Sequence, residues 1–229
     1  MWLPDSRLEL PAAFNSLKAP EYRVKIDWSD PVTYGLRVYL LFNYVNLVNL
    51  AKPANIVKNA KPIITRTSGD SALRNNAYYY YPATYTKFTV AAGAVWPASV
   101  SGAVYLQGAA VSTYMFANIS SVRLDTRIYG HRAFTSDATI AAGDKPRTVV
   151  CFDDTNDLSS IHNWTPKEYQ VVRDHNNTST ETGTPYWRLT HIDSATYPRP
   201  YYFAEWDRYL SREECDIMIY EPFRFLVPV

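Results

Sequence analysis

The sequence predicts an all-β fold, a sandwich or jelly roll in one domain, with a single short helix near its C-terminus. Short runs rich in aromatic and β-branched residues recur at roughly ten-residue spacing, with turn residues between them. Hydrophobic residues make up 47% of the 229 residues, which is enough for a sizeable packed core. The eight glycines form no glycine-rich phosphate loop, which argues against a nucleotide-binding α/β fold.

The first part of the chain differs from the rest because prolines interrupt it repeatedly. Four prolines in this segment fix the backbone locally and bias the preceding residues toward extended conformations. The segment still carries many apolar side chains, which a disordered tail would lack. We therefore expect an extended N-terminal arm over residues 1–31 and a jelly-roll domain over residues 32–229. An edge strand followed by a loop is the alternative interpretation of the arm.

The strand pattern begins at YGLRVYLLFN and continues almost to the end of the chain. In this first run Val38 and Leu40 alternate with the equally apolar Leu41, so both faces of the strand are expected to be buried. Later strands are expected in NAYYYYPATY, in residues 88–96 and 102–107, and in TYMFANIS, VRLDTRIYGHRAF, RTVVCFDD, PYWRLTHID and RPYYFAEWDRY. Many short strands at this spacing favour a sandwich over a parallel sheet.

The stretch RYLSREECDIMIYEPF predicts the helix. Ser211 is followed three residues later by Glu214, which is the spacing of a capping box. Ile217 and Tyr220 are expected to share one face of the helix, and Pro222 is expected to end it.

Charge and cysteine content limit the classes of partner. The net charge is +1 and the basic residues are scattered, so we expect no binding to nucleic acid. We also expect no membrane segment and no signal peptide, because the start has neither a basic region nor an unbroken apolar run. Cys151 lies in an apolar strand, where a free buried thiol is expected. These features predict a soluble protein that folds in a reducing cytoplasm.

A pair of carboxylates near the C-terminus raises the question of catalysis. Glu205 and Asp207 lie two residues apart, as in the Glu-x-Asp-x-x-Glu strand of retaining glycosidases. At the place of the last glutamate this chain has Tyr209 and Leu210. Without a proton donor there the leaving group is not protonated, so we expect no enzyme and no catalytic residue.

Metal binding has one weak candidate, the acidic turn FDDTND. Asp153, Asp154 and Asp157 could together offer oxygen ligands to calcium, although acidic turns are more often simply solvated. The four histidines are dispersed, without the spacing of a metal site. We therefore expect no cofactor, with calcium as the alternative.

Aromatic residues suggest a sugar-binding surface. The chain has 19 tyrosines against nine phenylalanines, and tyrosine suits protein or sugar interfaces, although it is also a good strand former. The insertion-like stretch HNWTPKEYQVVRDHNNTSTETGTPYW is the variable loop most suited to display such residues. Trp164, Tyr186 and Trp187 are the candidate glycan-binding residues.

The C-terminal stretch EWDRYLSREECDIMIYEPFRFLVPV resembles laminin-G-like or concanavalin-A-like jelly rolls, above all those in structural proteins of tailed bacteriophages. Three further stretches, WSDPVTYGLRVYLLFN, KFTVAAGAVWPAS and GDKPRTVVCFDDTND, are similar to that family's strands and follow in the expected order. The likeness covers about residues 26–229. The glycine-rich turn usual after the first strand is replaced by YVNLVNLAKPAN, and the family's Asp-Gly has become Asp-Asp.

The resemblance implies a non-enzymatic virion structural protein of a tailed phage, most simply a capsid decoration protein assembled in the host cytoplasm. The apolar arm and C-terminus are then expected to attach it to the major capsid protein, to another virion protein or to further copies of itself. The residues expected to be buried there, or against the domain core, are Trp2, Leu8, Phe14, Phe223 and Phe225. The alternative is a carbohydrate-binding, lectin-like tail or receptor-binding module.

Overall fold

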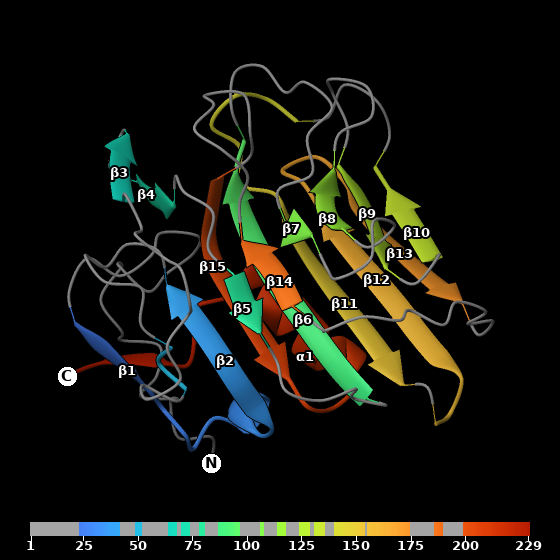
Figure 1. Ribbon diagram of the computed structural model, residues 1–229, viewed down its shortest axis with the longest axis horizontal. Coiled ribbons are helices and arrows are strands. Elements are labelled where there is room, and N and C mark those ends of the chain that lie inside the picture. The colour runs from blue at the N-terminus through green and yellow to red at the C-terminus, as the bar shows by residue number, and fades with distance from the viewer. Residues whose placement is uncertain are drawn as a thin grey trace, which may run out of the picture.

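In its computed structural model the described part of the protein is a β-sandwich with one α-helix (Figure 1). The structure describes residues 23–41, 49–51, 64–67, 70–73, 78–80, 87–96, 106–107, 114–117, 124–128, 131–135, 140–153, 155–174, 186–189 and 199–229. Within them the strands form two six-stranded antiparallel sheets and two smaller strand pairs. The predicted all-β jelly-roll sandwich is confirmed.

The central sheet has the strand order β13-β12-β11-β6-β15-β2. Its strands are β2 (Leu36–Leu41), β6 (Lys87–Val95), β11 (Arg147–Asp153), β12 (Leu158–Trp164), β13 (Tyr169–Asp174) and β15 (Arg199–Trp206). The first expected strand and those at KFTVAAGAV, RTVVCFD and RPYYFAEW are thus present. These four strands are neighbours in the sheet, although long stretches of chain separate them in the sequence.

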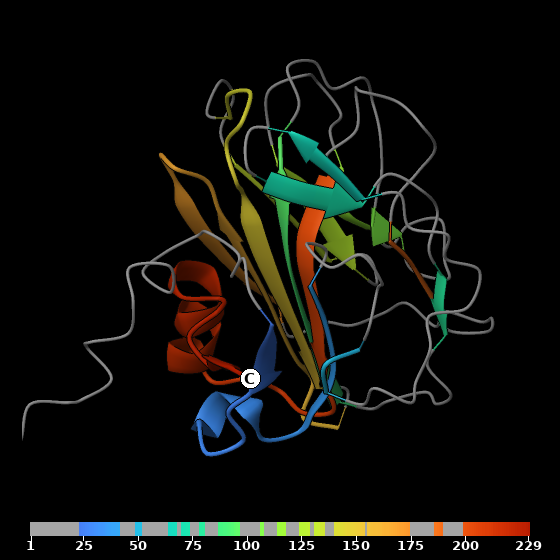
Figure 2. The ribbon, with the colours of Figure 1, turned by 90° about the vertical axis from the view of Figure 1, so that its left-hand side faces the viewer.

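The outer sheet has the order β10-β9-β8-β7-β14-β5. Its strands are β5 (Tyr78–Tyr80), β7 (Leu106–Gln107), β8 (Tyr114–Ala117), β9 (Asp125–Ile128), β10 (His131–Phe134) and β14 (Tyr186–Leu189). A further hairpin joins β3 (Ile64–Thr67) to β4 (Asp70–Leu73). Figure 2 shows the outer sheet and the helix α1 (Arg212–Tyr220) on opposite sides of the central sheet.

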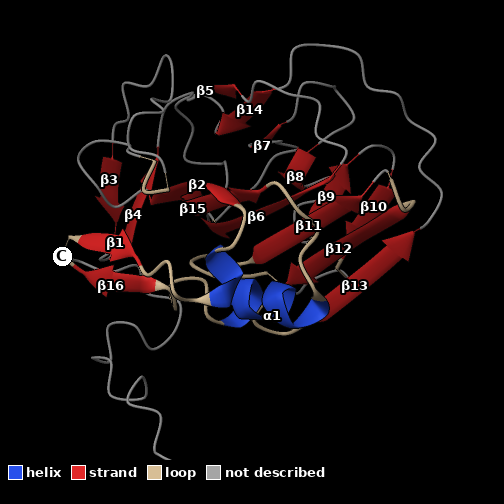
Figure 3. Cartoon of the chain, turned by 90° about the horizontal axis from the view of Figure 1, so that it is seen from below, coloured by secondary structure: helices blue, strands red, loops and turns tan. Residues whose placement is uncertain are grey.

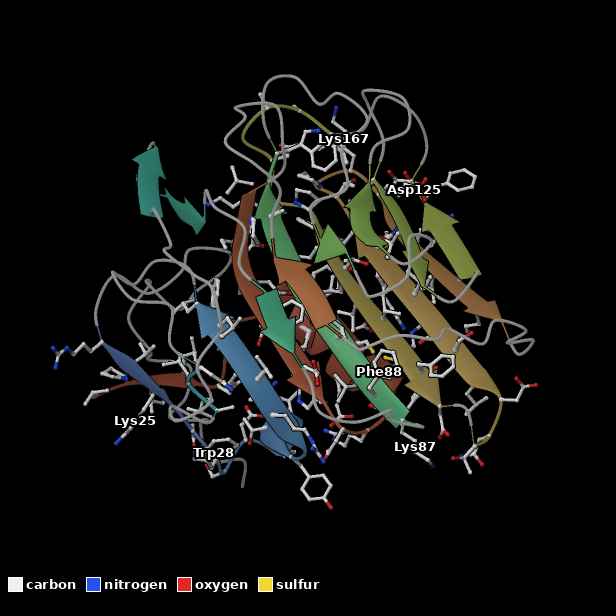
Figure 4. The ribbon with its side chains drawn as sticks, in the orientation of Figure 1. Lys25, Trp28, Lys87, Phe88, Asp125 and Lys167 are labelled. Carbon is white, nitrogen blue, oxygen red and sulfur yellow. The ribbon has the colours of Figure 1, made fainter. Side chains whose placement is uncertain are left out.

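Both faces of the central sheet are covered, as the apolar alternation of its first strand predicts. One face packs on α1 and the C-terminal segment, as the view from below shows (Figure 3), and its buried side chains include Tyr39 and Trp206. The other face lies against the outer sheet and includes Phe88, labelled in Figure 4. A hydrogen bond between side chains links the two sheets: Thr126 Oγ1 of β9 donates to Asn163 Oδ1 of β12 over 3.0 Å.

The two ends of the described chain pair with each other. β1 (Val24–Ile26) runs antiparallel to β16 (Leu226–Pro228), and a 3₁₀ turn, η2 (Pro31–Thr33), follows β1. Val24, Ile26 and Leu226 all belong to the core cluster under α1. The last part of the predicted arm is therefore built into the domain, whereas residues 1–22 lie outside the described residues.

The helix begins where the capping box predicts. The Ser211 hydroxyl accepts from the Glu214 N–H over 3.3 Å, and Glu214 in turn accepts from the Ser211 N–H over 2.8 Å. The buried face of the helix is not the one that carries Ile217 and Tyr220. Cys215, Met218 and Ile219 are buried, at the i, i+3, i+4 spacing of one helical stripe, while Tyr220 is half-exposed.

The expectation of a variable loop from residue 162 onward is also corrected. Residues 158–164 and 169–174 form a hairpin, β12–β13, inside the central sheet. Their polar side chains concealed the strand pattern, because Ser160, His162 and Asn163 are buried yet hydrogen-bonded to neighbours. A buried polar residue with its partners in place is compatible with a sheet core.

Gly93 in β6 occupies a position where any side chain would collide with the core. A Cβ atom there would lie 2.4 Å from the Tyr201 ring and 2.6 Å from Tyr202 Cε1, and both tyrosines are buried. We therefore expect Gly93→Ala to lower the free energy of unfolding by about 3 kcal/mol, measured by urea denaturation.

Gly143→Ala is the matched control, since nothing lies within 4 Å of its added methyl group. Its backbone φ of +87° disfavours alanine, so we expect a loss of only about 1 kcal/mol. A loss in Gly93→Ala no larger than that of Gly143→Ala would contradict the steric argument.

Candidate functional site

The residues predicted to bind a partner fall into two groups. Trp2, Leu8 and Phe14 lie outside the described residues. Phe223 and Phe225 are buried in the domain's own core, Phe223 edge-on to Tyr202 at 5.9 Å and Phe225 edge-on to Tyr39 at 5.0 Å. The structure gives the expected burial against the domain core for these two rings, so neither presents a surface to a partner.

Glu205 and Asp207 do not form a carboxylate pair in a cleft. Glu205 is 2% exposed and, by strand alternation with Ala204 and Trp206 on the helix face, points toward the outer sheet. Asp207 lies at the end of β15, where Arg37 Nε donates to its Oδ2 over 2.8 Å. A register shift in the pairing of β15 with β2 falls between Glu205 and Trp206.

The Glu205 carboxylate is buried, and neither of its oxygens has a hydrogen-bond partner among the described residues. Burial raises its pKa to about 8; the Asp207 charge also raises it and the Arg37 charge opposes both. Glu205 is therefore a neutral acid near pH 7. The structure places it in the core and not at a surface open to substrate.

The acidic turn after β11 is organised by hydrogen bonds within the chain. Asp153 accepts from the backbone N–H groups of Thr155 and Asn156, and Lys87 forms an ion pair with its second oxygen at 3.0 Å. Asp154 lies outside the described residues, and Asp157 is exposed with a left-handed φ of 52°. Within the described part of the chain no group of three or more acidic, histidine or cysteine side chains could hold a metal ion.

A hydrogen-bond chain links β12 and β13 to α1. Tyr169 donates its hydroxyl proton to Asp216 Oδ1 over 2.6 Å, so His162 Nδ1, 3.0 Å from the Tyr169 oxygen, is the donor there. His162 Nε2 then accepts from Ser160, whose oxygen accepts from Tyr209 over 2.9 Å. Burial lowers the pKa of His162 to about 4, although the Asp216 charge opposes this, so the ring is neutral.

A serine bonded to a neutral histidine is an arrangement that can activate a hydroxyl. Ser160, however, is 2% exposed and pairs across the sheet with Cys151, which touches α1. In the folded protein the chain of bonds therefore fixes α1 on the sheet, because each member has its partner in place.

Aromatic side chains gather where β12, β13 and the end of α1 meet. Tyr220 is edge-on to Trp164, with ring centroids 6.4 Å apart at an interplanar angle of 78°, and lies 6.0 Å from the Tyr169 ring. Trp164 and Tyr169 are partly buried, whereas 47% of Tyr220 is exposed. We call Trp164, Tyr169 and Tyr220 the aromatic corner. It contains Trp164, one of the three residues predicted for glycan binding.

Arg147 of β11 holds Trp164 from the buried side. Its guanidinium carbon lies 3.7 Å from the centroid of a Trp164 ring, close enough for a cation–π interaction. The side chain is fully buried, and within the described part of the chain its Nε and Nη1 atoms have no hydrogen-bond partner. Burial lowers the pKa of Arg147, while nearby tyrosines oppose the shift. A charge in this position favours one fixed orientation of the Trp164 ring.

The other two predicted glycan residues lie in the outer sheet. Tyr186 and Trp187 begin β14, where they pair with Tyr80 and Tyr79 of β5. Their side chains lie outside the described part of the structure, whereas their backbone belongs to the outer sheet, across the central sheet from α1 (Figure 2).

A second exposed aromatic surface was missed by the sequence analysis. Trp28 is 57% exposed and Tyr34 78% exposed, on the loop that joins β1 to β2 through η2. Trp28 lies near the lower edge of the molecule (Figure 4). Lys167, in the turn between Trp164 and Tyr169, lies at the upper end (Figure 4). Exposure of large rings was not predictable from this proline-interrupted segment, which offers no periodicity.

Two properties of the described segments bear on the expected partners. None of their helices is long and apolar enough to cross a bilayer. Exposed large hydrophobic residues in them are Trp28, Tyr34, Phe134, Tyr220 and Val229. Four of these five exposed residues are aromatic.

Comparison with known proteins identifies the fold. No protein-family model and no curated protein matches the sequence. The structure is similar to the binding domain of botulinum neurotoxin DC in complex with SialylT, with a TM-score of 0.55, 8% identity, and coverage of 82% of this chain and 52% of that one. It is also similar to Trypanosoma rangeli sialidase, with a TM-score of 0.52, 12% identity, and coverage of 82% and 33%.

A third similar structure is a complete small domain. It is domain 4 of an extracellular arabinanase from Geobacillus stearothermophilus in complex with arabinotriose, with a TM-score of 0.54 and 11% identity. The match covers 80% of this chain and 98% of that domain, whereas the chain spans about half of the toxin domain and a third of the sialidase. At these identities the likeness shows the shared β-sandwich, a fold consistent with the expected concanavalin-A-like or laminin-G-like class.

Proposed function

We propose that this protein is a non-catalytic carbohydrate-binding domain and that the aromatic corner contacts the sugar. The observation that carries the proposal is the right-angled arrangement of Trp164 and Tyr220 at the end of α1. Sugars present C–H groups on one face and hydroxyl groups around the edge. When two rings lie near right angles, a sugar can stack on one ring while the second ring contacts its side. Tyr220 also adds a hydroxyl group that can form hydrogen bonds.

The surroundings of the corner make it rigid, which favours binding. Arg147 fixes Trp164 from below, and the bond between Tyr169 and Asp216 ties β13 to the helix that carries Tyr220. A preorganised site loses less conformational entropy when a ligand binds. Similarity to domains solved with arabinotriose or SialylT supports this proposal through the fold alone.

The virion role implied by the resemblance to phage structural proteins remains a prediction. The fold is compatible with it, but none of the three similar structures described above is a phage protein. A carbohydrate-binding domain could also serve on a virion as a receptor-binding module, so the two roles do not conflict. We place glycan binding first because an arrangement of described residues suggests it.

Tyr220→Ala is expected to weaken glycan binding at least tenfold. The change removes one wall of the corner from a half-exposed position, so it should leave the fold intact. The full chain would first be screened on an array containing neutral arabino-oligosaccharides and sialylated glycans. Titration calorimetry on the best ligand then measures the affinity of the wild type and the variant, and assays of the same sugars should show no release.

Trp28→Ala and Tyr34→Ala are the matched controls, since they remove exposed rings on the loop between β1 and β2. We expect both to bind like the wild type. If Trp28→Ala loses binding and Tyr220→Ala does not, the sugar site is the loop of Trp28. If no glycan on the array binds, the proposed function is wrong.

A further inference from the structure

The two cysteines of the chain meet in the core between α1 and the central sheet. Cys151 lies in β11 and Cys215 in the first turn of α1, 64 residues apart in sequence, with their sulfur atoms 3.3 Å apart. Both side chains are fully buried and carry free thiols. The chain contains no other cysteine, so this pair has no competitor within one molecule.

We propose that Cys151 and Cys215 form a disulfide under oxidising conditions, which joins α1 covalently to the middle of the central sheet. A disulfide places its sulfur atoms about 2.05 Å apart, so they need to approach by a little over 1 Å. Rotation of the two short side chains supplies movement on that scale. The partners are held in position, since β11 is paired on both sides with β6 and β12, and the Cys215 N–H donates to Ser211 O over 2.9 Å.

Because of its position, the disulfide would hold α1 on the central sheet and stabilise the folded protein. Cys215 immediately precedes Asp216, which accepts from Tyr169 at the edge of the same sheet. α1 is the only helix besides η2 in the described residues, and it covers one face of the central sheet. A bridge that closes a loop of this length restricts the unfolded chain and so stabilises the folded one.

The oxidant required is a small-molecule disulfide such as oxidised glutathione. One cysteine thiolate attacks it, forms a mixed disulfide and releases one glutathione thiolate, which takes up a proton. The second cysteine thiolate then attacks the protein sulfur of the mixed disulfide and releases the other glutathione. Two protein thiols are thereby oxidised and one glutathione disulfide is reduced. Because both sulfurs are buried, the exchange takes place before α1 docks or during its local opening.

The test uses the full chain refolded in a glutathione redox buffer and, in parallel, with excess dithiothreitol. In the oxidised sample we expect no free thiol after denaturation, a mass lower by two hydrogen atoms, and a monomer on non-reducing gels. Its melting temperature should exceed that of the reduced sample by roughly 10 °C. Cys151→Ser and Cys215→Ser should show no such difference between the two buffers.

Three results would overturn the proposal: two free thiols persisting in the refolded wild type, a bridge between molecules only, or an oxidised form that melts no higher than the reduced one. If the serine variants fail to fold, the comparison of oxidised and reduced wild type decides alone. None of these readings depends on glycan binding, so the proposal can fail without affecting the proposed function.

Discussion

Glu205→Gln is expected to remove most of the decline in stability of the wild-type protein between pH 6.5 and pH 8. Burial raises the native pKa of Glu205 to about 8, whereas the unfolded chain has the ordinary value of 4.5. Between these values the native state holds a proton that the unfolded state has released. Stability is therefore highest at low pH with respect to this group and falls as the pH rises toward 8.

The window above pH 6.5 isolates this effect from His162. The pKa of His162 falls to about 4 in the native state from 6.5, so its influence is confined to lower pH, where stability is lost on acidification. Between the two pKa values, the free energy of unfolding falls by about 1.4 kcal/mol for each pH unit. From pH 6.5 to 8, ionisation of Glu205 should therefore lower the free energy of unfolding of the wild type by roughly 2 kcal/mol. Glutamine has the same shape and does not titrate, so the variant should lose little.

Urea denaturation at four pH values across this window measures the difference. Glu221→Gln makes the same chemical change at an exposed position and should retain the wild-type slope. A Glu205→Gln protein with the wild-type slope would show that Glu205 is ionised in the native core. That result would require a hydrogen-bonding or charged partner for its carboxylate.

Trp206→Ala is expected to destabilise the protein far more than Trp28→Ala or Tyr220→Ala. Trp206 is fully buried under α1, and its Nε1 donates to the Val32 carbonyl oxygen over 2.7 Å. Truncation leaves a large cavity and removes the partner of a buried carbonyl. A loss of about 4 kcal/mol or more is expected, which is a large share of the stability of an ordinary domain.

Thermal unfolding followed by circular dichroism provides the measurement. Trp206→Phe separates the two contributions, because it fills most of the cavity while removing the N–H donor, and it should lose less than alanine does. Trp28→Ala deletes the same ring from an exposed position and should change stability by well under 1 kcal/mol. Equal losses in Trp206→Ala and Trp28→Ala would contradict the anchoring role of Trp206.

The buried Trp206 explains what the C-terminal sequence signature does. Arg208, two residues further along the chain, donates two hydrogen bonds to Glu214 and a third to the Tyr34 carbonyl. The signature EWDRYLSREE thus joins β15, the loop before β2 and the start of α1. These contacts account for the motif as a structural element.

Sequence reasoning was accurate where a local pattern determines a local structure. The capping box of Ser211 and Glu214 involves atoms three residues apart, and the alternation in β2 reflects a strand buried on both faces. It was inaccurate for the β12–β13 hairpin. Polar residues there are buried because partners from other strands satisfy them, and a window of sequence does not contain those partners.

By itself, the sequence determined that the chain is an all-β sandwich with one capped helix, because strand alternation and helix caps are short-range features. The tertiary structure alone decided that Glu205 faces the interior, that Trp164 meets Tyr220, and that Cys151 meets Cys215. Each of these depends on long-range strand order and on the docking of α1. Such contacts depend on the packing of the whole chain, which no short stretch of sequence records.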